Sequence, residues 1–323
     1  MYDDRSDPQT SVRLTTRLIT EDGVRFIFGP YSSGITNATS AIGERYRVIT
    51  IATTANAPDL YERGYRYLFG TLPLATTYLH PVLEMAAALP EPPEKVAIIT
   101  PENLFAIAAA EGARQKAEEL GLKVVYFARY PQDTTDVSSL LSAIRDAGAD
   151  MLLSTGFLQD GMLIVRQAKE LRYNPKIMGF TVAASIPDFR TNLGRDAEGI
   201  MGGEWWAPSM AWEDDFFGSA SQYAEEFEQR FGYVPTYHAA SSSIGGYLLQ
   251  LAIERAGTLD TEAVRRELLA LDEVTMFGPI RFSDKGVNEA SSAAGFQIQD
   301  GQIVLLWPED ISEGSLVYPK PGW

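Results

Sequence analysis

The 323-residue chain contains no cysteine, which excludes disulfide bonds, thiolate nucleophiles and thiolate metal sites. It has only two histidines, His80 and His238, and neither belongs to an HExxH motif, so no metal site is expected. The sequence also lacks a GxSxG elbow, a Walker loop and a GxGxxG motif. Carboxylates are plentiful, but no acid–base pair can be singled out. The sequence therefore predicts neither an enzyme nor a bound cofactor.

Positive charge is scarce. The chain has 27 Lys and Arg against 43 Asp and Glu, a formal net charge of −16, which argues against nucleic acid and anionic membrane surfaces as partners. No apolar run is long enough to cross a bilayer, and the first residues do not form a signal peptide. A hydrophobic content of 45% is typical of a globular protein, and the length predicts two domains.

Strand and helix patterns alternate through the first part of the chain, which predicts an α/β fold with doubly wound parallel sheets. A helix from Asp7 or Thr10 to Thr20 is expected to bury Val12, Leu14, Leu18 and Ile19. Strands are expected at 24–28, 48–52, 66–70, 95–100, 123–128, 150–155, 176–180 and 199–205. Helices are expected at 35–45, 76–89, 104–120, 136–147 and 160–171. Beyond them we expect helices at 219–231, 239–256 and 261–270 and short strands at 278–282, 294–299 and 302–307.

Two of the predicted strands end in loops that carry hydroxyl groups. The first is followed by Gly29-Pro30 and then Tyr31-Ser32-Ser33-Gly34, and the second by Thr53 to Asn56. Ligands bind at the carboxyl ends of strands in open α/β sheets, and the start of the helix after Ser32 can hold a carboxylate. A capped turn between strand and helix explains the same residues equally well.

Several motifs, in order and spacing, resemble the leucine/isoleucine/valine-binding protein family. They are YDDRSDP at the start, FGPYSSG, NAP, RGYRYLFGT, VRQAKELRYNPKIMG, FGPIRFSDKG and the tail LLWPEDISEGSLVYPKPGW. Members are extracytoplasmic receptors of ABC importers with the type I periplasmic-binding fold. The resemblance implies two α/β lobes joined by three crossovers near 71–76, 203–208 and 278–282. We expect residues 1–73 and 207–279 to form the first lobe, and residues 74–206 and 280–323 the second.

The start of the chain departs from the family pattern. Members place a strand, a helix and most of a second strand before the Tyr-Asp-Asp segment, whereas here Met1 precedes it directly. The resemblance thus implies an N-terminal truncation, so the missing signal segment carries no information. We expect the chain alone to fold poorly because it lacks a central strand.

The resemblance also implies which residues bind the ligand. On the first lobe, the carboxylate of the ligand is expected to contact Ser33, with Tyr31 and Ser32 beside it, and Thr54 and Asn56. On the second lobe, Phe105 and Phe157 match aromatic positions of the family, although core packing is the alternative for both. Two further aromatic residues are candidates: Trp206 either closes over the ligand or packs between lobes, and Tyr237 precedes a predicted helix from which it could reach the cleft.

One position of the second lobe does not match the amino-acid binders. They use a Glu to pair with the ligand ammonium, and that position is Thr181 here. A hydroxyl cannot neutralise a buried ammonium, and an unpaired buried charge costs several kcal/mol. Either Asp160 or another acid replaces the Glu, or the ligand is not a standard α-amino acid. A carboxylate with an apolar or aromatic body fits the visible residues at least as well.

The sequence and the resemblance together predict a monomeric, periplasmic or otherwise extracytoplasmic binding protein. It would close about a hinge on a small carboxylate and deliver it to a membrane permease. Two alternatives remain: a ligand-sensing domain of a receptor or regulator with the same fold, and a small-molecule enzyme on a Rossmann-like scaffold.

Overall fold

The computed structural model describes residues 1–323, which divide into two compact units. Unit 1 comprises residues 1–74 and 206–292, and unit 2 comprises residues 75–205 and 293–323. The last change between units differs from the expected one, because residues 280–292 stay with unit 1. They do so because β11 (Asp272–Thr275) pairs with β12 (Gly278–Arg281), and Val287 then bridges to Gly70. Pairing between residues so distant in sequence leaves no local signal.

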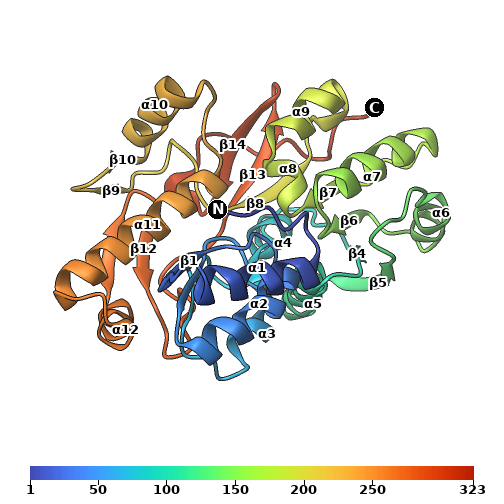
Figure 1. Cartoon of the computed structure of the whole chain (residues 1–323). Coiled ribbons are helices and arrows are strands. Elements are labelled where there is room, and N and C mark those ends of the chain that lie inside the picture. Colours follow the sequence, from blue (N-terminus) through green and yellow to red (C-terminus); the bar gives the residue numbers. More distant parts are fainter. The chain divides into compact units, whose positions relative to one another are not determined.

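Unit 1 contains a three-stranded parallel sheet in the order β1-β2-β3, of which β1 is labelled in Figure 1. The strands are β1 (Phe26–Phe28), β2 (Ile49–Ala52) and β3 (Leu68–Gly70), close to the predicted ranges. All four residues of β2 are buried, as expected for an apolar strand with cover on both faces. The helices of this segment are α1 (Pro8–Thr20), α2 (Ser33–Tyr46) and α3 (Pro58–Tyr61).

Helix α1 buries a different face from the one predicted. Asp7 caps it by accepting a hydrogen bond from the Thr10 N–H at 2.8 Å, as expected. Its buried residues, however, are Ser11 and Thr15, while the predicted apolar positions are only half-buried. The prediction was wrong because α1 packs against α2, and small side chains permit that close approach.

The second segment of unit 1 is mainly helical. It contains β9 (Glu213–Asp214), β10 (Gly218–Ser219), α10 (Ala220–Phe231), α11 (Tyr237–Ala256) and α12 (Thr261–Leu269), followed by β11 and β12. Helix α11 lies close to the sheet, since a Cβ at Gly245 would be 3.0 Å from Ile51 Cγ2. The Ser241 hydroxyl donates to the Thr53 carbonyl at 2.5 Å and lies 2.7 Å from Thr71 Oγ1, so α11 is joined to the ends of β2 and β3.

Unit 2 is built on a seven-stranded sheet in the order β14-β13-β8-β7-β6-β4-β5. Its parallel strands are β4 (Lys95–Pro101), β5 (Lys123–Tyr130), β6 (Met151–Ser154), β7 (Ile177–Phe180) and β8 (Met201–Glu204). The antiparallel strands β13 (Ala294–Gln299) and β14 (Gln302–Trp307) extend the sheet beyond β8. The predicted α/β fold with parallel sheets is confirmed, with these two antiparallel strands at one edge.

The helices of unit 2 are α4 (His80–Ala87), α5 (Leu104–Glu119), α6 (Ser138–Asp146), α7 (Leu158–Glu170), α8 (Val182–Ser185) and α9 (Pro187–Leu193), with short 3₁₀ turns at Ala75–Thr77, Gly194–Ala197 and Glu309–Ile311. They follow the predicted pattern, apart from the late start of α4 and the two short helices α8 and α9, which were not predicted. The helix expected over 76–89 begins only at His80, because Pro81 occupies its first turn, where a missing N–H costs nothing. Helix α5 packs on the 3₁₀ turn at Ala75–Thr77 through Gly112, where a Cβ would collide with the Thr76 backbone.

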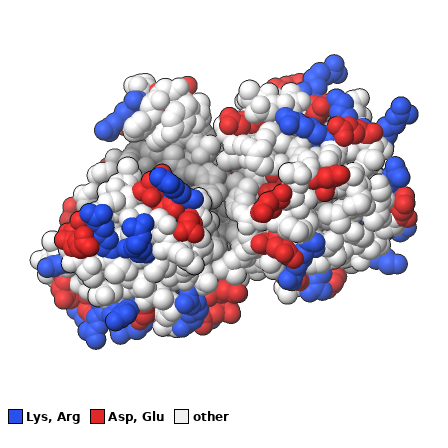
Figure 2. All heavy atoms as spheres, turned by 45° about the vertical axis from the view of Figure 1, so that its right-hand side comes forward, with Lys and Arg blue, Asp and Glu red and all other residues white.

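Charged side chains of both signs are interspersed on the face displayed in Figure 2. No broad basic surface is visible there, in keeping with the excess of acidic residues.

Candidate functional site

The loop after β1 is a capped turn. Ser32 has extended backbone angles, and its Oγ accepts a hydrogen bond from the Ile35 N–H at 3.2 Å, which starts α2. The Thr36 hydroxyl donates to the Pro30 carbonyl at 3.1 Å and fixes the loop from the helix side. The N-terminal N–H groups of α2 therefore lie at the carboxyl end of the unit 1 sheet, where an anion is stabilised.

Ser33 connects the two predicted binding loops. Its hydroxyl oxygen accepts hydrogen bonds from the N–H groups of Asn56 and Ala57, both at 3.2 Å, and the residue is 2% exposed. Thr54 forms a second connection by donating to the Tyr31 carbonyl at 2.9 Å. The structure thus brings Tyr31, Ser32, Ser33, Thr54 and Asn56 together, and the contact of these residues with a ligand stays a prediction.

Asn56 has one satisfied and one unsatisfied end. Its Nδ2 donates a hydrogen bond to the Pro73 carbonyl oxygen at 2.7 Å. Because a carbonyl oxygen can only accept, the nitrogen of the Asn56 side-chain amide must face Pro73. Its Oδ1 is buried and has no hydrogen-bond partner. A buried acceptor without a partner is costly, and an acceptor cannot bind a carboxylate, so the side chain of Asn56 gives no support to the predicted carboxylate contact.

An aromatic group lies beside the Tyr31 loop. The Tyr31 hydroxyl is 3.2 Å from His238 Nε2, and the two rings stack with centroids 5.5 Å apart. The Tyr237 ring also stacks on the His238 ring, with centroids 3.9 Å apart. Tyr31 is 47% exposed, but desolvation of its hydroxyl beside His238 raises the pKa of Tyr31 to about 12. Burial lowers the pKa of His238 to about 4, so both groups are neutral at pH 7. The sequence analysis did not predict a contact between His238 and Tyr31, because the two residues are 207 positions apart and meet only through the tertiary fold.

Trp206 is fixed inside unit 1. Its Nε1 donates to the Met276 carbonyl at 2.9 Å, and its ring meets Tyr223 edge-on at 5.7 Å. With 2% of its surface exposed, Trp206 is a buried residue of unit 1, and its contact with a ligand stays a prediction. The expected second lobe included residue 206, whereas this segment of unit 2 ends at Trp205 and Trp206 belongs to unit 1.

Four aromatic side chains of unit 2 form a cluster near the carboxyl ends of its strands. Phe105 and Phe157 stack with centroids 5.7 Å apart and an interplanar angle of 25°. Tyr78 meets Phe105 edge-on at 6.0 Å and Trp205 at 4.9 Å. We call Tyr78, Phe105, Phe157 and Trp205 the aromatic cluster. Tyr78 was missed from the sequence, because only the packing of α5 brings it to Phe105.

Thr181, which directly follows β7, is fully buried. Its hydroxyl donates to the Gly156 carbonyl at 3.1 Å, and its N–H donates to the Ser154 carbonyl at 3.2 Å. Thr181 therefore ties the loops after β6 and β7 together and contributes no charge.

The acid named as a substitute, Asp160, is occupied within unit 2. Its Oδ2 accepts the Phe157 N–H at 2.8 Å, and its Oδ1 accepts the Tyr130 hydroxyl at 3.2 Å. Burial raises the pKa of the Asp160 carboxyl, which further disfavours a free negative charge.

A second acid, Glu204, ends β8 and is 4% exposed. Its Oε1 accepts a hydrogen bond from the Trp205 backbone N–H at 3.0 Å. Burial lowers the pKa of the Arg190 guanidinium, and the negative charge of Glu204 opposes this shift in part. The sequence prediction missed this acid, because the pattern around it reads only as a strand end. The half-buried Asp160 and the buried Glu204 therefore each have a hydrogen-bond partner in unit 2.

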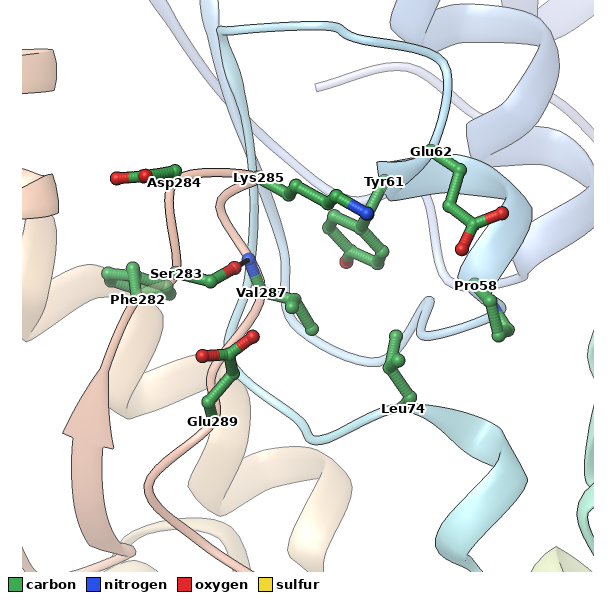
Figure 3. Close-up of a pocket in the computed structure, with 10 residues that line it drawn as sticks. All are labelled: Pro58, Tyr61, Glu62, Leu74, Phe282, Ser283, Asp284, Lys285, Val287 and Glu289. Atoms are coloured by element: carbon green, nitrogen blue, oxygen red, sulfur yellow. Dashed lines mark hydrogen bonds between the residues drawn. The ribbon is translucent and has the colours of Figure 1, made fainter.

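Unit 1 also has a hollow of about 510 Å³, shown in Figure 3. Glu62 borders it from the end of α3, and Lys285 and Glu289 border it from the segment after β12. The full lining is Pro58, Tyr61, Glu62, Leu74, Phe282, Ser283, Asp284, Lys285, Val287 and Glu289. None of these is a predicted binding residue, so the hollow is separate from the Ser33 loops.

No helix of the chain combines the length and apolar character needed to pass through a membrane.

Comparisons with known proteins give a consistent result. The model of a family described as periplasmic binding protein matches residues 1–302. A Leu/Ile/Val-binding protein homolog 7 from Brucella suis is 26% identical over 331 residues, which cover 98% of this chain and 82% of the relative.

Solved structures share the fold. A leucine-binding protein LivK from Thermotoga maritima superposes with a TM-score of 0.85 and 20% identity, covering 94% of this chain and 85% of that one. A solute-binding protein from R. palustris in complex with 4-hydroxybenzoate has a TM-score of 0.82 and 21% identity, covering 100% of this chain and 87% of that one.

A LivJ substrate-binding protein from Streptococcus pneumoniae, in complex with isoleucine, has a TM-score of 0.80 and 18% identity, covering 98% of this chain and 86% of that one. The same fold therefore accepts an amino acid in one relative and an aromatic acid in another. The family match spans nearly the whole sequence, and this chain belongs to the periplasmic binding proteins.

Proposed function

We propose that the protein is the extracytoplasmic solute receptor of an ABC importer and binds a small carboxylate with an apolar or aromatic body. The solute lacks the α-ammonium of an amino acid. The observation that carries this proposal is the uncharged, fully buried Thr181, beside which the Asp160 carboxyl already accepts two hydrogen bonds inside unit 2. Bringing an ammonium to such a place would leave a desolvated charge without a partner, at a cost of several kcal/mol.

The carboxylate of the solute is held by unit 1. The Ser33 hydroxyl, which uses its oxygen to accept two backbone N–H groups, keeps its own proton for donation. The N-terminus of α2 lies beside it and favours an anion by about 0.3–1 kcal/mol. Each hydrogen bond to the carboxylate adds roughly 1.5–3 kcal/mol.

The apolar body of the solute packs against unit 2. The stacked rings of Phe105 and Phe157 offer aromatic faces, and such ring contacts contribute about 0.5–1.5 kcal/mol beyond area burial. The relative that binds 4-hydroxybenzoate supports an aromatic acid, whereas the isoleucine-binding relative represents the competing choice.

Binding is coupled to hinge closure, and the closed form is the one that the membrane permease accepts. A solute shifts the open–closed equilibrium only by its differential affinity for the two states. Contacts with both units therefore stabilise the closed form, while contacts with unit 1 alone leave the equilibrium unchanged.

A thermal-shift screen tests the proposed solute class. The panel contains the proteinogenic amino acids, benzoate and its hydroxylated derivatives, and straight and branched aliphatic acids. We expect a saturable rise in Tm with one or more acids that lack an amino group. A saturable rise with leucine or valine alone would refute the proposed class.

A further inference from the structure

Two adjacent tryptophans of this chain differ in one respect. Trp205 and Trp206 are both buried, with 4% and 2% of their surfaces exposed. The Trp206 indole N–H donates to Met276, whereas the Trp205 Nε1 is buried and has no hydrogen-bond partner. A buried donor without an acceptor costs about 1–3 kcal/mol, so native structures rarely retain one without a use.

The position of Trp205 suggests that use. It directly follows β8, at the carboxyl edge of the unit 2 sheet, where α/β proteins bind their ligands. Its backbone N–H is held by Glu204 Oε1 at 3.0 Å, and its ring meets Tyr78 edge-on at 4.9 Å. Through Tyr78 it belongs to the same aromatic cluster as Phe105 and Phe157. The indole therefore packs against Tyr78 while its N–H has no partner.

A second unused donor is associated with the same strand end. Arg190 Nη1 is also buried without a partner, and the Arg190 guanidinium feels the charge of Glu204, the residue before Trp205. Both unpaired groups are donors, so the complement they require is an oxygen with free lone pairs.

We propose that Trp205 determines specificity by donating its indole N–H to an oxygen carried on the body of the bound acid, away from the carboxylate. The substrate class is then an oxygen-substituted aromatic acid, bearing a hydroxyl, methoxy or oxo group, in place of a plain hydrocarbon acid. This inference rests on the proposed function. A site with a buried donor discriminates against an analogue that lacks the acceptor, because the donor is then left unpaired.

Calorimetric titration of the full chain with benzoate and with each hydroxybenzoate isomer tests the inference. We expect the wild type to bind one isomer at least about tenfold more tightly than benzoate, which corresponds to one hydrogen bond of about 1.4 kcal/mol. Trp205→Phe keeps an aromatic ring and removes the N–H, so it should lose this preference and bind benzoate within about threefold of the wild type.

Trp307→Phe is the matched control. It removes an indole N–H of the same unit, one that already donates to Glu84 Oε2 at 2.9 Å, and should keep the preference. If circular dichroism shows that Trp205→Phe is unfolded, the wild type is titrated with 4-methoxybenzoate and 4-ethylbenzoate. The first has an ether oxygen, which can only accept a hydrogen bond, where the second has a methylene group. Tighter binding of the methoxy acid then supports the inference, and equal binding overturns it.

The outcomes separate the two proposals. Equal affinity of the wild type for benzoate and every hydroxybenzoate, or an unchanged preference in Trp205→Phe, overturns the role of Trp205 and leaves the proposed function standing. Binding of leucine without binding of any acid overturns the proposed function and the inference together.

Discussion

Ser33 is the single residue on which the candidate carboxylate site depends most. It joins the loop after β1 to the loop after β2, and it is the only side chain that accepts both the Asn56 and Ala57 N–H groups. The sequence predicted this residue as a ligand contact, and the structure adds that it also holds the site together.

Ser33→Ala should lower the free energy of unfolding by about 1–3 kcal/mol, because two buried N–H groups lose their acceptor. The same change should weaken binding of the solute at least tenfold. Urea denaturation followed by circular dichroism gives the first value. Ser221→Ala, an exposed serine of α10 whose hydroxyl contacts only Ser219, is the control and should stay within about 0.5 kcal/mol of the wild type. Equal stability of the two variants would contradict the structural role of Ser33.

His238 should make stability depend on pH. Its pKa is lowered by burial to about 4, whereas the unfolded chain has a pKa of about 6.5 at this residue. Below pH 6.5 the unfolded state therefore binds the proton first, so stability falls as pH drops from about 6.5 to about 4. The expected loss is about 1–2 kcal/mol, allowing for partial exposure of the ring.

Denaturation of the wild type and of His238→Gln at several pH values measures this contribution. The variant should show a shallower loss of stability between pH 6.5 and pH 4, while the remaining acids and His80 contribute equally to both proteins. Identical slopes would show that His238 titrates normally in the folded state.

At the scale of elements, the sequence predicted most of the secondary structure but not how distant elements meet. The apolar strands β2, β4, β6 and β7 lie where buried runs placed them, since such runs need no tertiary information. The face that α1 buries was missed, because it depends on the small side chains at its contact with α2. Short helices such as α8 and α9 were missed because they carry less than two turns of periodic pattern.

The candidate site divides in the same way. The loops with Ser33 and Thr54 were predictable, since polar residues directly follow apolar strands. Tyr78 and His238 were not, because each reaches its neighbours only through packing between elements that are apart in sequence, and Glu204 was not, because the pattern around it indicates only the end of a strand. Strand-end residues can thus be read from pattern, whereas the side chains that orient them cannot.

Two helical glycines give an element-scale prediction. A Cβ at Gly112 of α5 would collide with the Thr76 backbone, whereas a Cβ at Gly246 of α11 would meet nothing within 4 Å. Gly112→Ala should therefore destabilise the protein by about 1–3 kcal/mol, because α5 must shift away from its 3₁₀ turn. Gly246→Ala should stabilise it by about 0.4–1 kcal/mol through the lower entropy of the unfolded chain. Denaturant midpoints decide the signs, and a neutral Gly112→Ala would contradict the close packing of α5.

For the whole molecule, three features bear on the choice of solute: the acidic composition, the membership of the periplasmic binding proteins and the uncharged Thr181 in unit 2. The net charge of −16 leaves small solutes and a permease as more suitable partners than nucleic acid. Family membership explains the fold, and relatives with this fold bind both isoleucine and 4-hydroxybenzoate. The choice between these solute classes therefore depends on the charge available around Thr181.

The central claim is that the site recognises a carboxylate without an ammonium, and matched ligands test it most directly. Calorimetric titration compares L-leucine with 4-methylpentanoate and L-phenylalanine with 3-phenylpropanoate, pairs that differ only in the amino group. The account predicts that the acid without the amino group binds at least about tenfold more tightly in any pair that binds, since burying an unpaired ammonium costs more than about 1.4 kcal/mol. Tighter binding of leucine or phenylalanine than of its partner would contradict the account.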